Sequence, residues 1–438
     1  MNIDMELYKD NRDRVSSQLK QGEALLLFGA NHHLRNGDAE YSFRQSSNFL
    51  YLSGLHEADV ALVLVGGDER RFILFVTPKD KKREIWTGTM VGVEGAVVDY
   101  GADVAFPITD LKGKLVELFG GIGTLYYRFG DNHERDQMVQ SAVAGARRKA
   151  RKSFAVTPTR FVDPDSLIGP IRLIKSAREI ALMERAAALT RDAHAKAMAM
   201  AAPGRNEFEV EAVLAHTFRM GGGVGPSYES IVATGVNACT LHYVKNDTEI
   251  AAGDLVLIDA GCEFAGYAAD VTRTFPASGR FTAPQRSLYE IVLRANIEVV
   301  NFVKPGVRFS ELQQITIRIL TEGLIELGLL KGDADQLIEE RAFDRFYMHG
   351  VSHWLGLDVH DAGPYCEDGE SIALREGMAL TIEPGLYVQA DDMDAPAEYR
   401  GIGIRIEDDI LVTKTGARNL TAQIPKSIEE IELSIGSR

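Results

Sequence analysis

Short apolar runs alternate with amphipathic helical segments through the first part of the chain, which predicts an α/β domain over residues 1–170. The segments with helical spacing are Met5–Leu19, Leu111–Leu118 and Asp136–Lys152. The buried-strand candidates are Ala24–Phe28, Ala61–Val65 and Arg71–Val76, and the last two flank a turn that predicts a hairpin. Pro164 and Gly169 interrupt the pattern, so we expect a domain boundary near Phe161–Gly169.

Residues 171–438 repeat one order of helices and strands. Ser176 and Glu179 form a capping-box sequence, and helical spacing continues from there until Pro203–Gly204. The four expected helices are Ser176–Ala202, Glu207–Met220, Gln285–Val303 and Ser310–Leu327. Each helix pair precedes a block of strands, which predicts an internal duplication with a cleft between the two related halves.

Composition narrows the class of protein. The 438 residues are 45% hydrophobic and carry a net charge of −15, which argues against nucleic acid or an anionic membrane as the main partner. No apolar run approaches the ~18 residues of a membrane span. Cys239, Cys262 and Cys366 form no CxxC motif, so neither a disulfide framework nor a zinc–thiolate site is expected. The N-terminal segment is polar and unlike a signal peptide, so we expect a cytoplasmic protein.

Two aspartates mark the segment Val256–Phe275, which has the pattern of a β-hairpin. If Glu263 pairs with Gly266, then Asp259 lies directly opposite Asp270, with β-carbons roughly 4.5–5.5 Å apart. Two ionised carboxylates at that spacing repel, so one of them holds a proton or a cation lies between them. The alternative is a pair of exposed aspartates on a polar hairpin face.

Further candidate ligands follow in the second half of the chain. His349, His353 and His360 fall within thirteen residues, in HGVSHWLGLDVHD, which favours a ligand or acid–base role over isolated polar residues. Glu383 ends a strand-like run before Pro384–Gly385. In GIGIRIEDDILV, isoleucines alternate with Arg405 and Glu407, so the two charged residues share one face of a strand. The alternative here is an edge strand whose charged face meets water.

One imidazole and four carboxylates make up the candidate metal set: Asp259, Asp270, His353, Glu383 and Glu407. This oxygen-rich set fits manganese, cobalt or zinc better than a sulfur-loving metal. Four carboxylates exceed the needs of one catalytic zinc and suit two ions roughly 3.5–4 Å apart with bridging carboxylates.

Four stretches together resemble successive signatures of the pita-bread metallopeptidases, and of aminopeptidase P (Xaa-Pro aminopeptidase) in particular. They are LIDAGCEFAGYAADVTRTFP, HGVSHWLGLDVHD, LTIEPGLY and GIRIEDDILVT, and NGDAEYSFRQSSNFLYLSGL resembles the start of that enzyme. The resemblance implies a creatinase-like α/β domain over 1–170, which serves oligomerisation and completes the substrate site. It also implies a catalytic pita-bread domain with a pseudo-twofold duplication over 171–438.

The resemblance assigns roles residue by residue. Asp259 would bind one metal ion, His353 and Glu383 the other, and Asp270 and Glu407 would bridge the two. The residues expected around the substrate are His242, His349, His360, Tyr387 and, from another subunit, Trp86, and Arg405 would orient the metal-binding carboxylates. Core or interface packing is the alternative for Trp86. The stretch Cys366–Ser371 lacks the basic residue that the family pattern leads us to expect, which bears on how the substrate tail is held.

The implied reaction is hydrolysis of the N-terminal Xaa-Pro bond by a hydroxide that bridges two divalent ions, most simply Mn²⁺, with Zn²⁺ or Co²⁺ as alternatives. Glu383 would act as general base and then acid, and His360 or His242 would stabilise the oxyanion. Peptides with proline at the second position are the expected partners, and a homodimer or homotetramer is the expected assembly. The alternatives are a prolidase acting on dipeptides, a metal-free peptide-binding protein and a creatinase-like hydrolase.

Overall fold

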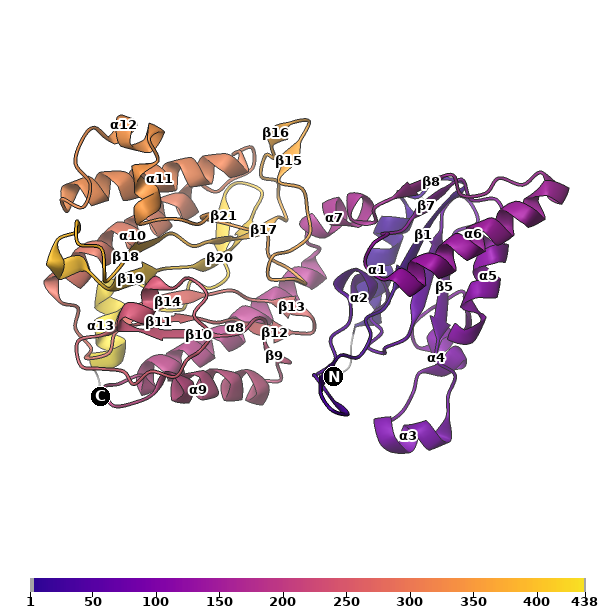
Figure 1. Cartoon of the computed structure of the whole chain (residues 1–438), viewed down its shortest axis with the longest axis horizontal. Coiled ribbons are helices and arrows are strands. Elements are labelled where there is room, and N and C mark those ends of the chain that lie inside the picture. Colours follow the sequence, from indigo (N-terminus) through magenta and orange to yellow (C-terminus); the bar gives the residue numbers. More distant parts are fainter. Residues whose placement is uncertain (1–3, 437–438) are drawn as a thin grey trace. The chain divides into compact units, whose positions relative to one another are not determined.

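In the computed structural model, which describes residues 4–436, the chain divides between Ile171 and Arg172 into two units. The N-terminal unit is built on a six-stranded sheet with the order β6-β5-β4-β1-β7-β8 (Figure 1). The bounds of its strands are β1 (Glu23–Phe28), β4 (Ala61–Val65), β5 (Arg71–Val76), β6 (Val104–Pro107), β7 (Thr124–Tyr126) and β8 (Arg160–Val162). A separate hairpin pairs β2 (Leu34–Asn36) with β3 (Ala39–Glu40).

The sheet of this unit is mixed. The predicted hairpin is confirmed, because β4 and β5 pair antiparallel and β4 also pairs antiparallel with β1. The other three pairs, β5 with β6, β1 with β7 and β7 with β8, are parallel, since a helix or a longer connection separates their members in the sequence.

Helices flank this sheet, and two of them pack on one face of it. The helices are α1 (Met5–Ser16), α2 (Ser47–Ser53), α3 (Lys81–Thr87), α4 (Gly92–Val98), α5 (Leu111–Leu118) and α6 (His133–Ser153), with a 3-10 turn η1 (Ile108–Asp110). Leu115 of α5 and Val139 of α6 join Leu26 and Ile73 of the sheet in one core cluster. Helix α6 begins three residues before the predicted start because the Asn132 side chain caps it by accepting the backbone N–H of Arg135.

We expected a domain boundary near Phe161–Gly169, and the division between the units lies two residues after that segment, within a helix. Helix α7 (Asp165–Leu173) begins directly after Pro164, a position that suits the start of a helix, and includes Pro170. It runs across the division between the units, so the covalent link between them is helical.

In the second unit, the four predicted helices are confirmed to within three residues at each end. They are α8 (Ala177–Met200), α9 (Glu207–Met220), α10 (Ala283–Phe302) and α11 (Phe309–Glu326). Ser176 and Glu179 form the predicted capping box at the start of α8. Thr282 and Gln285 form an equivalent capping box at the start of α10, so the two helix pairs share their N-terminal chemistry as well as their order.

Each helix pair is followed by short antiparallel strands. The first half holds β9 (Gly225–Pro226), β10 (Ile231–Thr234), β11 (Leu255–Asp259), β12 (Cys262–Phe264), β13 (Tyr267–Ala268) and β14 (Thr272–Pro276). The second half holds β15 (Cys366–Glu367), β16 (Glu370–Ser371), β17 (Ala379–Ile382), β18 (Gly385–Val388), β19 (Ile402–Arg405), β20 (Asp408–Val412) and β21 (Ala417–Asn419). The sheets β10-β11-β14 and β17-β20-β21 are the three-stranded counterparts in the two halves.

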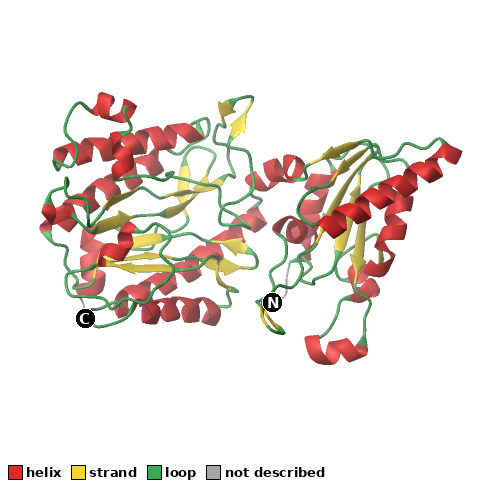
Figure 2. Cartoon of the chain, viewed as in Figure 1, coloured by secondary structure: helices red, strands yellow, loops and turns green. Residues whose placement is uncertain are grey.

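In the view of Figures 1 and 2, the strands β10, β11, β14, β18 and β19 lie between α9 below and α11 above, and the β15–β16 hairpin lies outside that space. Leu214 of α9 and Leu320 of α11 belong to one hydrophobic core with Ile258 of β11 and Ile404 of β19. The remaining short elements are η2 (Gly235–Cys239), α12 (Ala334–Glu339), η3 (Ala342–Arg345), η4 (Ala397–Tyr399) and α13 (Ile428–Gly436). Within residues 4–436, no helix has the length and apolar character needed to cross a membrane.

A buried arginine joins the strands of the two halves. Arg273 of β14 donates from Nη2 to Asp408 Oδ1 of β20 at 2.8 Å and from Nη1 to the Glu407 carbonyl at 2.5 Å. Lys426 Nζ lies 2.5 Å from the other Asp408 oxygen. These bonds hold the start of β14 against the start of β20, and the candidate ligands Asp270 and Glu407 directly precede or lie near those starts.

Candidate active site

The hairpin that carries Asp259 and Asp270 has a register different from the predicted one. Phe264 pairs with Tyr267, so the two-residue loop is Ala265–Gly266 rather than the segment one residue earlier. Ala265 and Gly266 have φ values of +51° and +89°, as the favoured two-residue hairpin turn requires. The prediction made Gly266 the last residue of the turn, paired with Glu263, rather than one of the two loop residues, where glycine tolerates a positive φ. Asp259 therefore pairs with Thr272, and the prediction that it lies directly opposite Asp270 is wrong.

The side chains of Asp259 and Asp270 still lie close together, because the backbone hydrogen bonds between the two strands of the hairpin are interrupted at Asp270. Asp270 lies across from Gly261, where a β-carbon would fall 1.7 Å from the Ala269 carbonyl oxygen. The Asp270 N–H leaves the ladder and donates to both carboxyl oxygens of Asp409, each at 3.2 Å. The two-residue change of register preserves the face on which each side chain points, so both carboxylates stay on one side.

Tyr228 lies between the two carboxylates. Its hydroxyl oxygen is 2.5 Å from Oδ1 of Asp259 and 2.5 Å from Oδ1 of Asp270. Asp259 is 9% exposed and Asp270 5%, so the alternative of two aspartates on a solvent-facing hairpin is wrong.

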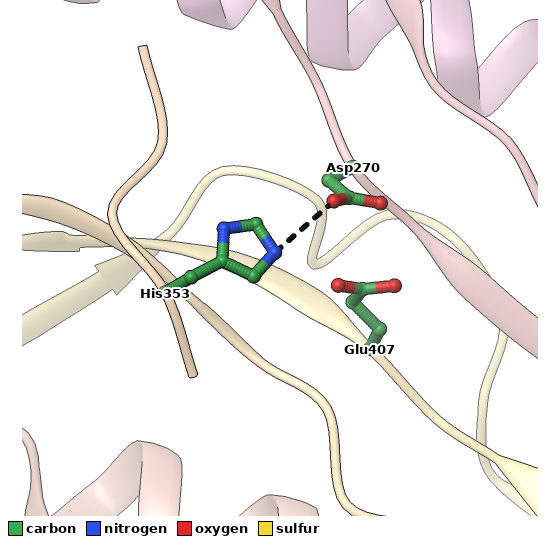
Figure 3. A group of neighbouring side chains, drawn as sticks. All are labelled: Asp270, His353 and Glu407. Atoms are coloured by element: carbon green, nitrogen blue, oxygen red, sulfur yellow. Dashed lines mark ion pairs between the residues drawn. The ribbon is translucent and has the colours of Figure 1, made fainter. Parts of the chain in front are cut away.

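Asp270, His353 and Glu407 converge from three separate segments (Figure 3). One ligand atom from each lies within 4.8 Å of the others. His353 Nε2 is 3.4 Å from Asp270 Oδ2, while Nδ1 is 3.0 Å from the Trp354 carbonyl oxygen. A carbonyl can only accept, so Nδ1 carries the proton in that bond and the Nε2 lone pair is available to a metal, as in most histidine ligands.

Glu407 and Arg405 share the buried face that the alternation predicts. The Thr272 hydroxyl donates to Glu407 Oε2 at 2.7 Å and accepts from Arg405 Nε at 3.1 Å. Arg405 Nη2 donates to Asp259 Oδ2 at 2.6 Å. Arg405 is 4% exposed and Glu407 1%, so the alternative of a charged strand face in water is wrong.

Glu383 completes the cluster from the end of β17. Its Oε1 lies 3.4 Å from His353 Nε2 and accepts the Thr381 hydroxyl at 3.2 Å. Thr381 also accepts the His353 N–H through its hydroxyl and donates its own N–H to the His353 carbonyl. Strand β17 and the histidine segment therefore fix each other, and the structure brings together all five residues of the candidate metal set.

Three of the expected substrate residues adjoin this cluster in a hydrogen-bonded series. Arg405 Nη1 donates to the Tyr387 hydroxyl at 2.9 Å, and that hydroxyl lies 2.9 Å from His349 Nε2. His349 Nδ1 is 2.8 Å from the Gly350 carbonyl, so Nδ1 carries the proton and Nε2 accepts from Tyr387. Burial lowers the pKa of His349 to about 4, which keeps the ring neutral at pH 7.

His360 and His242 lie on the exposed side of the cluster. The His360 ring meets the His353 ring edge-on, with centroids 4.3 Å apart. His242 is exposed and is close enough for its charge to lower the pKa of both His349 and His360. The three histidines outside the metal set thus surround the side of the cluster that a substrate could reach.

The electrostatics of the cluster fit divalent cations. Burial raises the pKa of Glu383 to about 7 and that of Glu407 well above its usual range, because the ionised forms lose hydration and repel one another. Burial opposes protonation of His353, yet the carboxylates of Asp270 and Glu383 raise its pKa to about 9. Carboxylates that favour a positive charge on the buried His353 ring would equally favour a bound cation at that place. The oxygen-rich set of donors matches hard or borderline metals.

Three residues of the site were not predicted from the sequence: Tyr228, Thr272 and Asp409. Tyr228 stands in a loop before β10, where nothing nearby in the sequence links it to the hairpin. Asp409 follows the recognised Glu407 by two residues, so strand alternation could have placed it on the same face. Thr272 is likewise two residues after Asp270, so strand alternation could have placed its side chain on the same face as Asp270.

Two further sequence features lie outside this cluster. Trp86 belongs to α3 of the N-terminal unit and is 89% exposed, so the alternative of core packing is wrong. The stretch Cys366–Ser371, which lacks its own basic residue, forms the β15–β16 hairpin and pairs with arginines from elsewhere. Arg308 contacts Glu370 at 2.5 Å and Arg375 contacts Glu367 at 3.2 Å.

Comparison with family models finds two matches that together span most of the chain. Residues 181–414 match the model of metallopeptidase family M24, and residues 8–126 match the model of the aminopeptidase P N-terminal domain.

Curated relatives and solved structures agree with those matches. The chain is 42% identical to a Xaa-Pro aminopeptidase of Escherichia coli over 432 residues, which covers 98% of this chain and 97% of the relative. It is 35% identical to human Xaa-Pro aminopeptidase 3 over 420 residues, covering 93% and 80% of the two chains. The structure of Pseudomonas aeruginosa aminopeptidase PepP superposes with a TM-score of 0.96 at 43% identity, covering 99% and 98%. Zn-substituted E. coli aminopeptidase P in complex with product superposes with a TM-score of 0.95 at 41% identity, covering 100% and 99%.

Proposed function

This chain belongs to the aminopeptidase P proteins of metallopeptidase family M24, and we propose that it removes the N-terminal residue from peptides whose second residue is proline. The observation that carries the proposal is the convergence of Asp270, His353 and Glu407 within 4.8 Å, with Asp259 and Glu383 beside them. The family and the relatives make the chain a metal-dependent aminopeptidase. The bond that it cleaves is the part we propose.

We assign the five side chains to two divalent ions. Asp259 would hold one ion, His353 and Glu383 the other, and Asp270 and Glu407 both. The shared hydroxyl of Tyr228 and the short Asp270–His353 distance support the bridging position of Asp270. Bound divalent ions in such a site polarise a carbonyl oxygen and lower the pKa of water.

The protein side chains supply proton transfer and orientation. Glu383, whose pKa is raised to about 7, is suited to take a proton from water and return it to the leaving proline nitrogen. His360 and His242, on the exposed side, are placed to donate hydrogen bonds to the oxygen of the scissile carbonyl. Arg405 holds Asp259 and Tyr387 in place, and Tyr387 in turn orients His349.

Recognition of proline must differ from recognition of other residues, because the Xaa-Pro peptide nitrogen carries no hydrogen. Selection therefore rests on the shape of the pocket and on contacts to carbonyl oxygens. We propose that neutral His349 and Tyr387 contribute to this pocket, and that Trp86 of α3 contributes from a neighbouring subunit. The Trp86 side chain is 89% exposed in the single chain, which supports this proposal. A neighbouring subunit that covered the indole would remove a large apolar surface from water.

The finer points of the proposal are Mn²⁺ as the native metal, a homodimer or homotetramer, and a cytoplasmic location. Three free cysteines support a reducing compartment. Metal analysis after purification without chelators tests the first point, and light scattering on the eluting protein tests the second. Asp270→Ala should retain less metal than the parent protein, and full metal content in that variant would remove the bridging assignment.

The decisive assay compares the peptide Arg-Pro-Pro with the dipeptide Gly-Pro, each in Mn²⁺ and in EDTA. We expect release of arginine from the tripeptide in Mn²⁺ and no release in EDTA. Cleavage of Gly-Pro alone would make the protein a prolidase. Cleavage of neither peptide in Mn²⁺ would contradict the proposed bond.

A further inference from the structure

A buried cluster of charges lies beneath the segment that carries His360. The Asp361 side chain is 2% exposed and contacts two cationic side chains that are buried as deeply, Lys175 and Arg172. Lys175 Nζ lies 2.9 Å from Asp361 Oδ2, and an Arg172 nitrogen contacts Oδ1. Arg172 also lies 2.8 Å from Asp358, so two acids balance two bases. None of these four belongs to the metal or substrate sets assigned above.

Asp361 closes residues 354–361 into a compact loop. Its N–H donates to the Trp354 carbonyl at 2.8 Å, and its Oδ1 accepts the N–H of Asp358 at 3.3 Å. Gly356 leaves room for the carboxylate, since a β-carbon there would lie 2.2 Å from Asp361 Oδ2. The carboxylate thus fills the space at the centre of the loop.

The loop sets the relative position of two histidines of the site. His353 stands immediately before it, and its Nδ1 bonds to the same Trp354 carbonyl that accepts the Asp361 N–H. His360 stands at its other end, with its ring 4.3 Å from that of His353. Because His353 is also held by Thr381, the Asp361 anchor has its main effect on His360.

The cationic side chains are themselves fixed to the strand that leads to Glu383. The Lys175 N–H donates to the Gly377 carbonyl at 2.8 Å, and Ile174 forms an isolated bridge with Met378, just before β17. Arg172 is the first residue of the catalytic unit and lies in α7. The anchor of His360 is therefore tied to the backbone that positions Glu383.

From this geometry we propose that Asp361 is a positioning residue for the reaction, which acts through His360 and is held by Lys175 and Arg172. The inference rests on the proposed function, because it names the residue that sets His360 toward the scissile carbonyl. Burying ions of both signs is costly, and an apolar cluster of similar volume would often be at least as stable. The cluster is therefore better explained by the fixed position it gives the loop than by stability.

A double-mutant cycle between Asp361 and His360 tests the inference on the full-length, metal-loaded protein. Asp361→Asn should lower kcat/KM for Arg-Pro-Pro by about 10- to 100-fold, the scale expected when a catalytic group is misplaced by about 1 Å. In the His360→Ala background, Asp361→Asn should cause little further loss, because its effect passes through the missing ring. Metal content measured on the same samples should stay at the parent level.

Asp361→Asn removes the negative charge that Lys175 and Arg172 both contact, which also lowers stability. Two further variants therefore separate an effect on the position of His360 from a loss of folding. Asp361→Asn with Lys175→Met removes one charge of each sign and should reproduce the loss in kcat/KM. Gly356→Ala leaves all charges in place but pushes the Asp361 carboxylate aside, and should act in the same direction. Asp392→Asn, which alters an ion pair outside the loop, is the matched control and should leave kcat/KM within about twofold.

Independent, multiplicative effects of Asp361→Asn and His360→Ala would overturn the inference, and so would loss of metal in step with activity. Parent turnover is measured first. If the parent enzyme cleaves another bond or peptide, the proposed function fails, and the cycle is run on the substrate that is cleaved. Non-additivity there would still support Asp361 as the residue that positions His360.

Discussion

Single side chains around the ligands determine how well this site can bind a metal, because a ligand needs a fixed orientation as well as the right donor atom. Thr272 is the clearest case. Its hydroxyl bonds to Glu407 and Arg405 together, and Arg405 bonds to Asp259. Residues in this outer layer are expected to matter nearly as much as the ligands themselves.

Thr272→Val keeps the shape of the side chain and removes the hydroxyl. Glu407 then loses a donor and Arg405 an acceptor, so we expect Mn²⁺ affinity to fall by about 10- to 100-fold. Titration of the metal-free protein with Mn²⁺ measures the change. Thr316→Val is the control, because that buried hydroxyl donates to the Leu312 carbonyl of its own helix, away from the metal cluster. Equal Mn²⁺ affinities in the two variants would contradict the role of Thr272.

At the scale of elements, the opening of the ladder between β11 and β14 decides whether the aspartates meet. Gly261 permits the close approach of the Ala269 carbonyl, and the Ser227 hydroxyl lies within hydrogen-bond distance of both the Gly261 and the Ala269 carbonyls. The close approach of the two strands at Gly261 depends on the absence of a side chain there, so a single added methyl group should disturb it.

Gly261→Ala places a β-carbon 1.7 Å from a backbone oxygen, which the strands can only relieve by moving apart. We expect a loss of about 1–3 kcal/mol of stability together with weaker metal binding. Urea denaturation and metal analysis measure the two effects. Gly416→Ala, where nothing lies within 4 Å of the added carbon, should change neither. A stable Gly261→Ala variant with full metal would show that the ladder is more adaptable than the structure suggests.

On the scale of the whole molecule, the catalytic unit is held together where its two halves meet. Arg273 of the first half bonds to Asp408 and to the Glu407 carbonyl of the second, and its guanidinium also reaches the carbonyls of Ile424 and Pro425. Arg273, Asp408 and Glu407 are all buried, so losing one of these groups leaves hydrogen-bond partners unsatisfied away from water.

Arg273→Met should lower the stability of the catalytic unit by about 3–5 kcal/mol, because it leaves Asp408 with Lys426 as its one cationic partner. Urea denaturation followed by far-UV circular dichroism measures the loss. Arg318→Met removes a surface arginine of α11 and should cost less than about 1 kcal/mol. A small effect at Arg273 would mean that apolar contacts alone hold the halves together.

The dependence of stability on pH should reveal the metal site. Burial raises the pKa of Glu383 to about 7, whereas an unfolded glutamate has a pKa of about 4.3. Metal-free protein therefore loses the contribution of this group to stability as the pH rises from about 4.3 through 7. A bound cation favours the ionised carboxylates, so the increase in Tm caused by Mn²⁺ should be larger at pH 8 than at pH 5.

Thermal scans with Mn²⁺ and with EDTA at several pH values provide the measurement. Asp361 and Asp408 have lowered pKa values and act in the opposite sense, since their contribution is lost at pH values below about 4. The range from pH 5 to pH 8 avoids that loss. An increase in Tm that does not vary with pH would show that the carboxylates are already ionised without metal.

The sequence by itself determined the elements that depend on local chemistry. Hydrophobic periodicity and end signals located the four helices of the catalytic unit, because the capping box at Ser176 and the Pro-Gly breaks act over a few residues. The hairpin pattern, the concentration of histidines and strand alternation selected the five candidate ligands, and motif resemblance then assigned their roles. Alternation in GIRIEDDILV correctly placed Arg405 and Glu407 on one face, since strand parity does not depend on the partner strand.

Only the tertiary structure decided how distant segments meet. The hairpin register depends on the positive φ angles of Ala265 and Gly266. The sequence pattern alone did not show which two residues of the turn adopt those angles. Tyr228 reaches Asp259 and Asp270 from a separate loop, and Asp361 reaches Lys175 across most of the catalytic unit's sequence. Such contacts depend on packing between elements, and packing is a property of the folded chain that local sequence patterns do not carry.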